Sequence, residues 1–235
     1  MYAIVDCRIS EASLSALGRR GFTPILMPPA DYLSKPVASH ADMLVFVGFG
    51  RLFCHEKYYK CNKTLIDNIL SAANLALSLS DEAISEKYPH DVLFNACLVG
   101  KRLICNEKTV SKSILDTAKA ENYEIISVSQ GYTKCSVCPV GENAIITADS
   151  GIAEACRLRK IEVLKISEGN VSLPPYEYGF IGGASGVCGK KIYFNGSLDL
   201  HPDGEKIKNF CTQNGAEVIC LSNEKLHDVG TIYFI

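Results

Sequence analysis

The 235-residue sequence lacks a strong net charge of either sign and lacks any long hydrophobic run. Its 24 basic and 26 acidic residues are interspersed, so no basic region predicts nucleic acid or an anionic membrane surface as a partner. No apolar run reaches the roughly 18 residues that would cross a bilayer, and the strand-like first residues contain no basic export signal. We therefore expect a cytoplasmic globular protein, with a core built from its 47% hydrophobic residues.

Low-complexity sequence is also absent, and only the proline-containing run at residues 27–36 resembles a linker. We therefore expect one domain that spans residues 1–235. The 11 cysteines are odd in number and follow no export signal, which favours free thiols over disulfides. Several lie inside apolar segments, where a thiol packs as a small hydrophobic group. These cysteines, which need no catalytic role, are Cys97, Cys105, Cys211 and Cys220.

A repeated order of predicted elements runs through the chain. Capping and terminating residues predict five helices, at residues 10–21, 62–76, 107–122, 150–159 and 202–214. A short run rich in strand formers follows each helix, most weakly the second, at residues 23–27, 75–79, 124–128, 162–166 and 217–221. Two short strands joined by a turn precede the later helices, at residues 93–105, 135–147 and 182–194. The repeating unit is therefore strand, turn, strand, helix and strand.

The starts of these units lie 43 to 49 residues apart, at Asp42, Asp91, Lys134, Gly183 and Asp228. The step from the last start through the C-terminus, and on from Met1 to the first start, is also 49 residues. The first and last strands would therefore form one hairpin. Five such units predict an α/β propeller of ββαβ blades that closes through the termini. Closure of the ring also protects sheet edges.

Three of the unit starts carry a histidine and an aspartate directly before strand-forming residues. The pairs are His40 with Asp42, His90 with Asp91, and His227 with Asp228. In a ring of blades the start of each inner strand faces the central axis, so polar side chains there would line a funnel. A polar cap or turn that satisfies backbone groups is the alternative role for each pair.

This architecture resembles the pentein fold of guanidino-group-modifying enzymes such as arginine deiminase, dimethylarginine hydrolase and amidinotransferase. A non-catalytic ribosome anti-association factor shares that fold. More closely, five segments look like an uncharacterised bacterial domain family grouped with those enzymes, at residues 88–96, 130–138, 178–186, 201–203 and 228–230. The resemblance covers the whole chain. It implies a five-bladed fold with a central funnel, and the family itself implies no activity.

The resemblance to the enzymes implies a nucleophilic cysteine, a histidine acid or base, and carboxylates that hold a guanidinium. The sequence departs from that pattern at three positions. Gly48 stands where a second acid is expected, Gly131 and Tyr132 stand at the usual histidine, and Ser185 stands at the usual cysteine. We therefore predict a protein that binds a small ligand without the standard triad. An active cysteine-dependent amidino or guanidino hydrolase or transferase is the alternative.

Reaction at an amidine carbon needs a thiolate, an acid or base that titrates near neutral pH, and a carboxylate. The predicted catalytic residues are Cys135 as nucleophile, His40 as acid or base, and Asp42 as partner of the cation. The alternatives are Cys138 as nucleophile, His90 or His227 as acid or base, and Asp91 or Asp228 as partner of the cation. The predicted ligand-binding residues are His90, Asp91, Asn95, Tyr132, Lys134, Ser185, His227 and Asp228. Lys134 would hold a carboxylate, so an amino-acid-like small molecule is as compatible as an amidino one. The sequence leaves the oligomeric state open.

No metal or cofactor is predicted. The Cys-Ser-Val-Cys run at residues 135–138 has no second pair of ligands for a closed zinc site, and it is expected to enter a strand. The glycine-rich run at residues 182–189 precedes a predicted strand rather than the helix of a phosphate-binding loop. His201 and Asp203 stand at a predicted helix start, where capping is the expected role.

Overall fold

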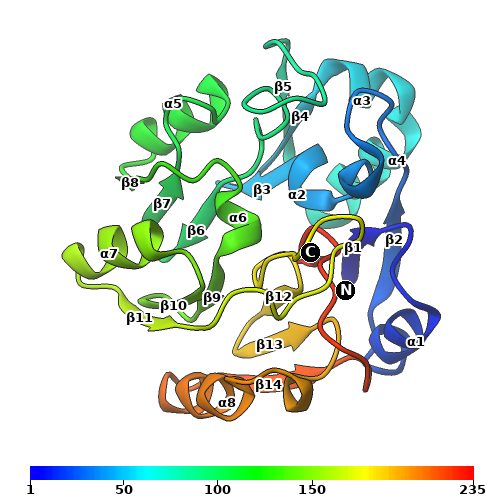
Figure 1. Ribbon diagram of the computed structural model, residues 1–235. Coiled ribbons are helices and arrows are strands. Elements are labelled where there is room, and N and C mark those ends of the chain that lie inside the picture. The colour runs from blue at the N-terminus through cyan, green and yellow to red at the C-terminus, as the bar shows by residue number, and fades with distance from the viewer.

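The computed structural model describes residues 1–235 and arranges them as five small three-stranded sheets. Figure 1 shows the sheets around a common centre, with most of the longer helices on the outside and the two chain termini close together. In each sheet the inner and middle strands are antiparallel, and the outer strand runs parallel to the middle one. The predicted five-bladed α/β fold, closed through its termini, is confirmed.

The first blade joins both ends of the chain. Its strand β1 (Tyr2–Asp6) lies between β15 (Tyr233–Phe234) and β2 (Thr23–Met27). The other blades follow chain order, and their strands are β3 (Val45–Gly48), β4 (Arg51–His55) and β5 (Ala76–Ser80); β6 (Cys97–Val99), β7 (Arg102–Cys105) and β8 (Glu124–Ser127); β9 (Cys138–Val140), β10 (Ala144–Thr147) and β11 (Glu162–Lys165); β12 (Ser185–Cys188), β13 (Lys191–Phe194) and β14 (Glu217–Cys220).

Helices connect the middle and outer strands of every blade. They are α1 (Glu11–Arg19), the pair α3 (Glu56–Cys61) and α4 (Lys63–Ala73), α5 (Lys112–Ala120), α7 (Ser150–Leu158) and α8 (Gly204–Gln213). Two 3₁₀ turns, η1 (Lys35–Val37) and η2 (Leu198–Leu200), complete the connections. The predicted helix at 62–76 has an extra helix, α3, before it, and it ends at Asn74 in the left-handed conformation. None of the helices is long and apolar enough to cross a membrane.

The outer helices bury one face, and α1, α3 and α7 also begin with a side-chain cap, as α7 illustrates. The Asp149 side chain accepts a hydrogen bond from the Ile152 N–H at 2.8 Å and so begins the helix. Ile152 and Cys156, one turn apart, are fully buried in a cluster that also contains Val99 of the preceding blade. Burial of one large aliphatic side chain contributes about 1.5–3 kcal/mol. Neighbouring blades therefore share one packed apolar cluster.

Two one-turn helices replace the predicted strand starts at the axis. They are α2 (Ala41–Leu44) and α6 (Thr133–Ser136), and each leads directly into an inner strand through a valine, Val45 or Val137. Ala41, Met43 and Leu44 favour helix, whereas the β-branched valine favours the extended chain that follows. The prediction that residues 135–138 enter a strand was therefore wrong for Cys135, which lies in α6, while Cys138 begins β9. All 11 cysteines are free thiols.

Candidate functional site

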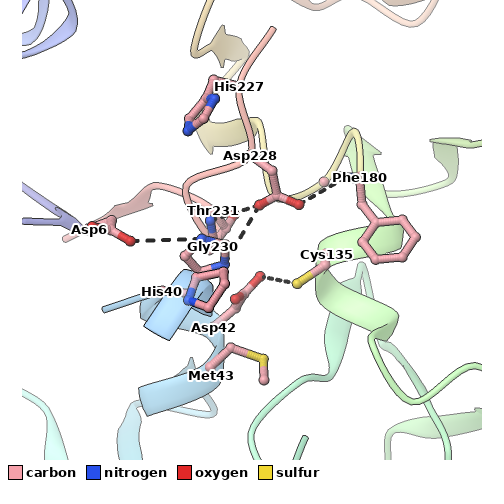
Figure 2. A network of polar contacts seen from close by, with 12 residues as sticks. Asp6, His40, Asp42, Met43, Cys135, Phe180, His227, Asp228, Gly230 and Thr231 are labelled. Carbon is pink, nitrogen blue, oxygen red and sulfur yellow. Dashed lines mark hydrogen bonds and ion pairs between the residues drawn. The ribbon is translucent and has the colours of Figure 1, made fainter. Parts of the chain in front are cut away.

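The loops and short helices at the axis bring together six polar side chains from different blades. They are Asp6 at the end of β1, His40 and Asp42 at α2, Asn95 before β6, Cys135 in α6, and Asp228 after β14. None of the six is more than 5% exposed. Figure 2 shows most of this network, with the Asp42 carboxylate directed at the Cys135 sulfur and His40 between Asp6 and Asp228.

Backbone hydrogen bonds tie these axial segments to one another. The Asp42 N–H donates to the Gly230 carbonyl at 3.0 Å, and the Thr231 N–H donates to the Gly183 carbonyl at 2.9 Å. The Gly183 N–H in turn donates to the Cys135 carbonyl at 2.9 Å. The site is therefore built on backbone that is fixed by hydrogen bonds across four blades.

Cys135 is held between a carboxylate and an amide. Its Sγ–H donates to Asp42 Oδ2 at 3.0 Å, and Asn95 Nδ2 donates to the sulfur at 3.1 Å. Asn95 also accepts from the backbone N–H of Lys134 at 2.6 Å, which fixes α6 against the next blade. Burial and the negative charges of Asp42 and Asp228 raise the pKa of the Cys135 thiol well above its ordinary value. The sulfur of the free protein is therefore a neutral thiol.

Asp42 is a buried carboxylate with one unpaired oxygen. Burial raises the pKa of Asp42 to about 6. The hydrogen bond from Cys135 and the positive charge of Lys134 lower this pKa, but burial is the larger effect. Oδ2 accepts from the thiol, whereas Oδ1 has no hydrogen-bond partner. A fully buried oxygen without a partner is unusual and marks a position where a donor would be stabilising.

Asp228 is oriented by two backbone donors. Its Oδ2 accepts from the Phe180 N–H at 2.8 Å and its Oδ1 accepts from the Gly230 N–H at 2.9 Å. Burial raises the pKa of Asp228, and His40 opposes that shift. A Cβ at Gly183 would overlap the carboxylate, and Gly230, at φ +64°, packs against His40 with no room for a side chain. The two glycines therefore make space for the Asp228 and His40 side chains.

His40 lies between two carboxylates from opposite sides. Its Nδ1 is 3.8 Å from Asp228 Oδ1, and its Nε2 is 3.8 Å from Asp6 Oδ2. Burial lowers the pKa of His40, while the charges of Asp228 and Asp6 raise it, and burial is the larger effect. Asp6 is shared with Arg8, whose guanidinium forms a fork of two hydrogen bonds at 2.9 and 2.6 Å.

A pocket of about 310 Å³ opens beside these groups. We call it the funnel. His40, Cys135 and Asp228 line its base, and its walls include Met43, Tyr132, Leu173, Tyr176, Tyr178 and Phe180. The rings of Tyr132 and Phe180 are stacked, with an angle of 23° between their planes. No lysine or arginine lines the funnel. The arrangement offers carboxylates at the base and aromatic faces at the sides.

Several predicted ligand-binding residues lie outside the funnel. His90 is exposed, and His227 faces a separate polar pocket with Arg8 and Lys225. Figure 2 shows His227 turned away from Cys135. Ser185 is buried and donates to the Gly182 carbonyl at 3.2 Å. Only one of the three predicted histidines, His40, therefore reaches the funnel.

Two other predicted residues lie behind the funnel. Lys134 donates through Nζ to Thr231 Oγ1 at 2.7 Å and does not line the funnel, so it is not placed to hold a ligand carboxylate there. Asp91 accepts from the Tyr132 hydroxyl at 2.6 Å and acts on the funnel through that ring. Burial and Asp91 raise the pKa of Tyr132, which makes the phenol a fixed wall rather than an acid or base.

Sequence reasoning found the wall residue Tyr132 but missed Asp6 and the other three aromatic wall residues. Asp6 ends the strand that closes the ring, which places it at the axis like the other unit starts. Tyr176, Tyr178 and Phe180 belong to the connection between β11 and β12, where no periodic pattern was available. No group of three or more histidine, cysteine, aspartate or glutamate residues is placed to hold a metal ion.

Comparison with solved structures shows the same fold in three kinds of enzyme. The chain is similar to DDAH from Pseudomonas aeruginosa complexed with citrulline, at 8% identity and a TM-score of 0.57, covering 94% of this chain and 91% of the other. It is similar to agmatine deiminase from C. jejuni, at 9% identity and a TM-score of 0.57, with 96% and 90% covered. It is also similar to SxtG, an amidinotransferase from Microseira wollei, at 10% identity and a TM-score of 0.55, with 89% and 72% covered.

The structural similarity shows that the chain has the fold of the guanidino-group-modifying enzymes, as the sequence resemblance implied. Because the sequence identities are so low, the similarity shows the fold alone. No curated protein sequence matches the chain. The sequence model described as "Family of unknown function (DUF6873)" matches residues 4–233. The chain therefore belongs to this family of unknown function and has the pentein fold.

Proposed function

We propose that the funnel binds a small cationic ligand through an amidino or guanidino group. The observation that carries the proposal is the buried negative charge beside the Cys135 thiol: the Asp228 carboxylate lines the base of the funnel, and the Asp42 carboxylate lies outside its lining, 3.0 Å from the Cys135 sulfur. Buried negative charge without a nearby cation is costly. The positive charge of Lys134 acts on Asp42 from outside the funnel, and Arg8 is paired with Asp6, so no lysine or arginine lines the funnel and a ligand cation would supply the missing partner.

The shape of the funnel supports a planar cation. An amidinium or guanidinium presents paired N–H donors in one plane, and carboxylates accept them in a two-bonded arrangement. Tyr132 and Phe180 present near-parallel rings, and aromatic faces attract cations. A volume of about 310 Å³ lies at the lower end of the range for small-molecule pockets.

Calorimetric titration with acetamidinium tests this proposal. Acetamide, which has nearly the same shape and no charge, is the matched control ligand. We expect saturable binding of acetamidinium and none of acetamide, because only the cation pairs with the carboxylates. In Asp228→Asn we expect at least about a tenfold loss of affinity, as for a broken charged hydrogen bond. Equal affinity for the two ligands would overturn the proposal without reliance on any variant.

A second candidate function is cysteine-dependent amidino transfer or hydrolysis. The 3.0 Å contact between Cys135 and Asp42 favours it, because Asp42 can take the thiol proton. The sulfur would attack the amidino carbon, forming a C–S bond. The C–N bond to the amine would then break, the amine leaving with the proton held by Asp42. Water or a second amine would release the amidino group and restore the thiol.

Mass spectrometry after incubation with chloroacetamidine tests the second candidate. The amidinium of this reagent would pair with the carboxylates, and the sulfur would displace its chloride. A bound cation also lowers the pKa of the thiol by offsetting the charge of Asp42 and Asp228. We expect fast labelling confined to Cys135 and lost in Asp42→Asn. Slow labelling scattered over the 11 cysteines would leave binding as the function of the funnel.

A further inference from the structure

A second cavity, of about 160 Å³, lies beside α6 and shares two wall residues with the funnel. We call it the side cavity. The residues that decide its chemistry are Gln130, Ser136, Asp149, Glu168, Tyr178 and Phe180. Tyr178 and Phe180 line both cavities, whereas Cys135 lines only the funnel and Ser136 only the side cavity. The two cavities are therefore distinct.

Ser136 lines the side cavity, and its buried hydroxyl has no hydrogen-bond partner. Ser136 is 2% exposed, and its Oγ has neither a donor nor an acceptor within reach. Buried hydroxyl groups in folded proteins are nearly always paired, because an unpaired one costs about 1–3 kcal/mol. An unpaired hydroxyl beside a cavity marks a position where a hydrogen-bond partner would be stabilising.

The charge of the side cavity is entirely negative. Asp149 and Glu168 contribute carboxylates, and no lysine, arginine or histidine lines the cavity. Asp149 is fixed, since Oδ1 accepts from the Ile152 N–H at 2.8 Å and Oδ2 accepts from Gln130 Nε2 at 3.3 Å. Each carboxylate oxygen has a second lone pair that stays free for another donor.

We propose that the side cavity binds a primary ammonium group. Such a group has three N–H donors and no acceptor, which matches the Ser136 oxygen and the carboxylates of Asp149 and Glu168. An anion would meet two negative charges and no positive one. A metal ion lacks the cluster of three acidic, histidine or cysteine ligands that would hold it. The cavity has the volume of about five waters in the liquid, which leaves room for an ammonium group on a short alkyl chain.

This site is independent of the function proposed for the funnel. The test is an NMR titration of ¹³C-labelled methylammonium with the full chain, at constant ionic strength maintained with sodium chloride. We expect saturable binding that tetramethylammonium, which has the charge but no N–H donors, does not displace. Ser136→Ala and Asp149→Asn should each weaken binding about tenfold, and asparagine retains the capping oxygen of α7.

Two further variants separate the side cavity from other cationic sites. Glu168 is exposed in a loop, so Glu168→Gln leaves the fold intact, and it should weaken binding several-fold. Glu205→Gln, on the exposed face of α8, is the matched control and should have no effect. Asp228→Asn should also leave methylammonium affinity within about twofold, because Asp228 lines only the funnel.

The opposite pattern would overturn the proposal. If Asp228→Asn abolished methylammonium binding while Ser136→Ala and Glu168→Gln did not, the cation would bind in the funnel. Displacement by tetramethylammonium would indicate an unspecific charge effect, and the absence of saturable binding would show that the cavity takes no ammonium.

Discussion

The second and third blades begin with similar pairs of histidine and aspartate, but the two pairs lie in different surroundings in the folded protein. His40 and Asp42 before β3 are both buried at the axis, where Asp42 accepts a hydrogen bond from the Cys135 thiol. His90 before β6 is exposed, and Asp91 is buried against the Tyr132 hydroxyl, outside the contacts of Cys135. The two motifs look like copies in sequence, and only the first supplies groups to the funnel.

The difference arises from the few residues that follow each histidine. After His40, the one-turn helix α2 turns Asp42 inward, and its backbone N–H docks on the Gly230 carbonyl. After Asp91 no such helix forms, and the residue that reaches Cys135 is Asn95, which lies next to the strand. The blades therefore repeat as backbone units, whereas the chemistry at the axis is set by local turns that do not repeat.

Substitution of Asp42 and of Asp91 should reveal the largest difference between the two blades. We expect Asp42→Asn to weaken acetamidinium binding about 100-fold, because removal of one partner of a buried charge pair costs about 2–5 kcal/mol. Asp91→Asn should change the affinity by less than about threefold, since the asparagine oxygen still accepts from Tyr132. Calorimetric titration of both variants measures the contrast. Equal losses would mean that both carboxylates reach the ligand.

The pH dependence of stability should reveal the buried carboxylate of Asp42. Its pKa is about 6 in the folded protein against about 3.9 in an unfolded chain, so the folded protein holds the extra proton between pH 4 and 6. The free energy of unfolding therefore falls as pH rises through that window, by about 3 kcal/mol for this group. The asparagine side chain of Asp42→Asn does not titrate, so this variant does not lose stability in this way. The difference in free energy of unfolding between the variant and wild type should therefore shift in favour of the variant by about 3 kcal/mol as pH rises through the window.

Urea unfolding of wild type and Asp42→Asn at pH 4, 5, 6 and 7 measures the difference. The matched control is Asp67→Asn, because Asp67 is a surface carboxylate paired with Lys63 on α4. If the free energies of unfolding of Asp42→Asn and wild type differed by the same amount at every pH, Asp42 would titrate like an exposed carboxyl group.

The backbone repeat was predictable from sequence, whereas the direction of each axial side chain was not. Residues 150–159 carry a capping aspartate before them and apolar residues one turn apart, and α7 forms at Ser150–Leu158. By contrast, α2 and α6 are four residues long, too short for any periodicity to distinguish helix from strand. Ser185 illustrates the consequence, because it lies in the predicted pair of strands at residues 182–194 and yet its hydroxyl donates to the Gly182 carbonyl.

The funnel walls were beyond sequence reasoning for a different physical reason. Tyr176, Tyr178 and Phe180 lie in a connection without regular structure, so no period relates one side chain to the next. Their positions depend on contacts distant in sequence, such as the hydrogen bond from the Phe180 N–H to Asp228. Asp6 was missed because its role depends on closure of the ring, which brings the end of β1 beside His40.

The affinity for acetamidinium should weaken as the pH is lowered below about 6. This loss should be smaller than the loss caused by Asp42→Asn. An amidinium stays charged across this range, and it pairs with the ionised form of Asp42, whose pKa is about 6. At pH 5 about one tenth of Asp42 is ionised, so we expect about a tenfold weaker affinity than at pH 7. Calorimetric titrations at pH 5, 6, 7 and 8 test this. The same curve should persist in Asp91→Asn, and a flat curve in wild type would mean that Asp42 does not contact the cation.

Removal of the exposed His90 should have the smallest effect on stability and affinity, and the contrast with removal of the buried His40 compares the two blades directly. His90 is exposed and outside the funnel, so His90→Ala should change the free energy of unfolding by less than about 0.5 kcal/mol and leave acetamidinium affinity unchanged. His40 fills space between Asp6, Asp228 and Gly230, so His40→Ala should destabilise the fold and weaken binding together. Urea unfolding and calorimetry on the pair measure both effects. A loss of affinity in His90→Ala would place that histidine on the ligand path and restore the equivalence that the sequence suggested.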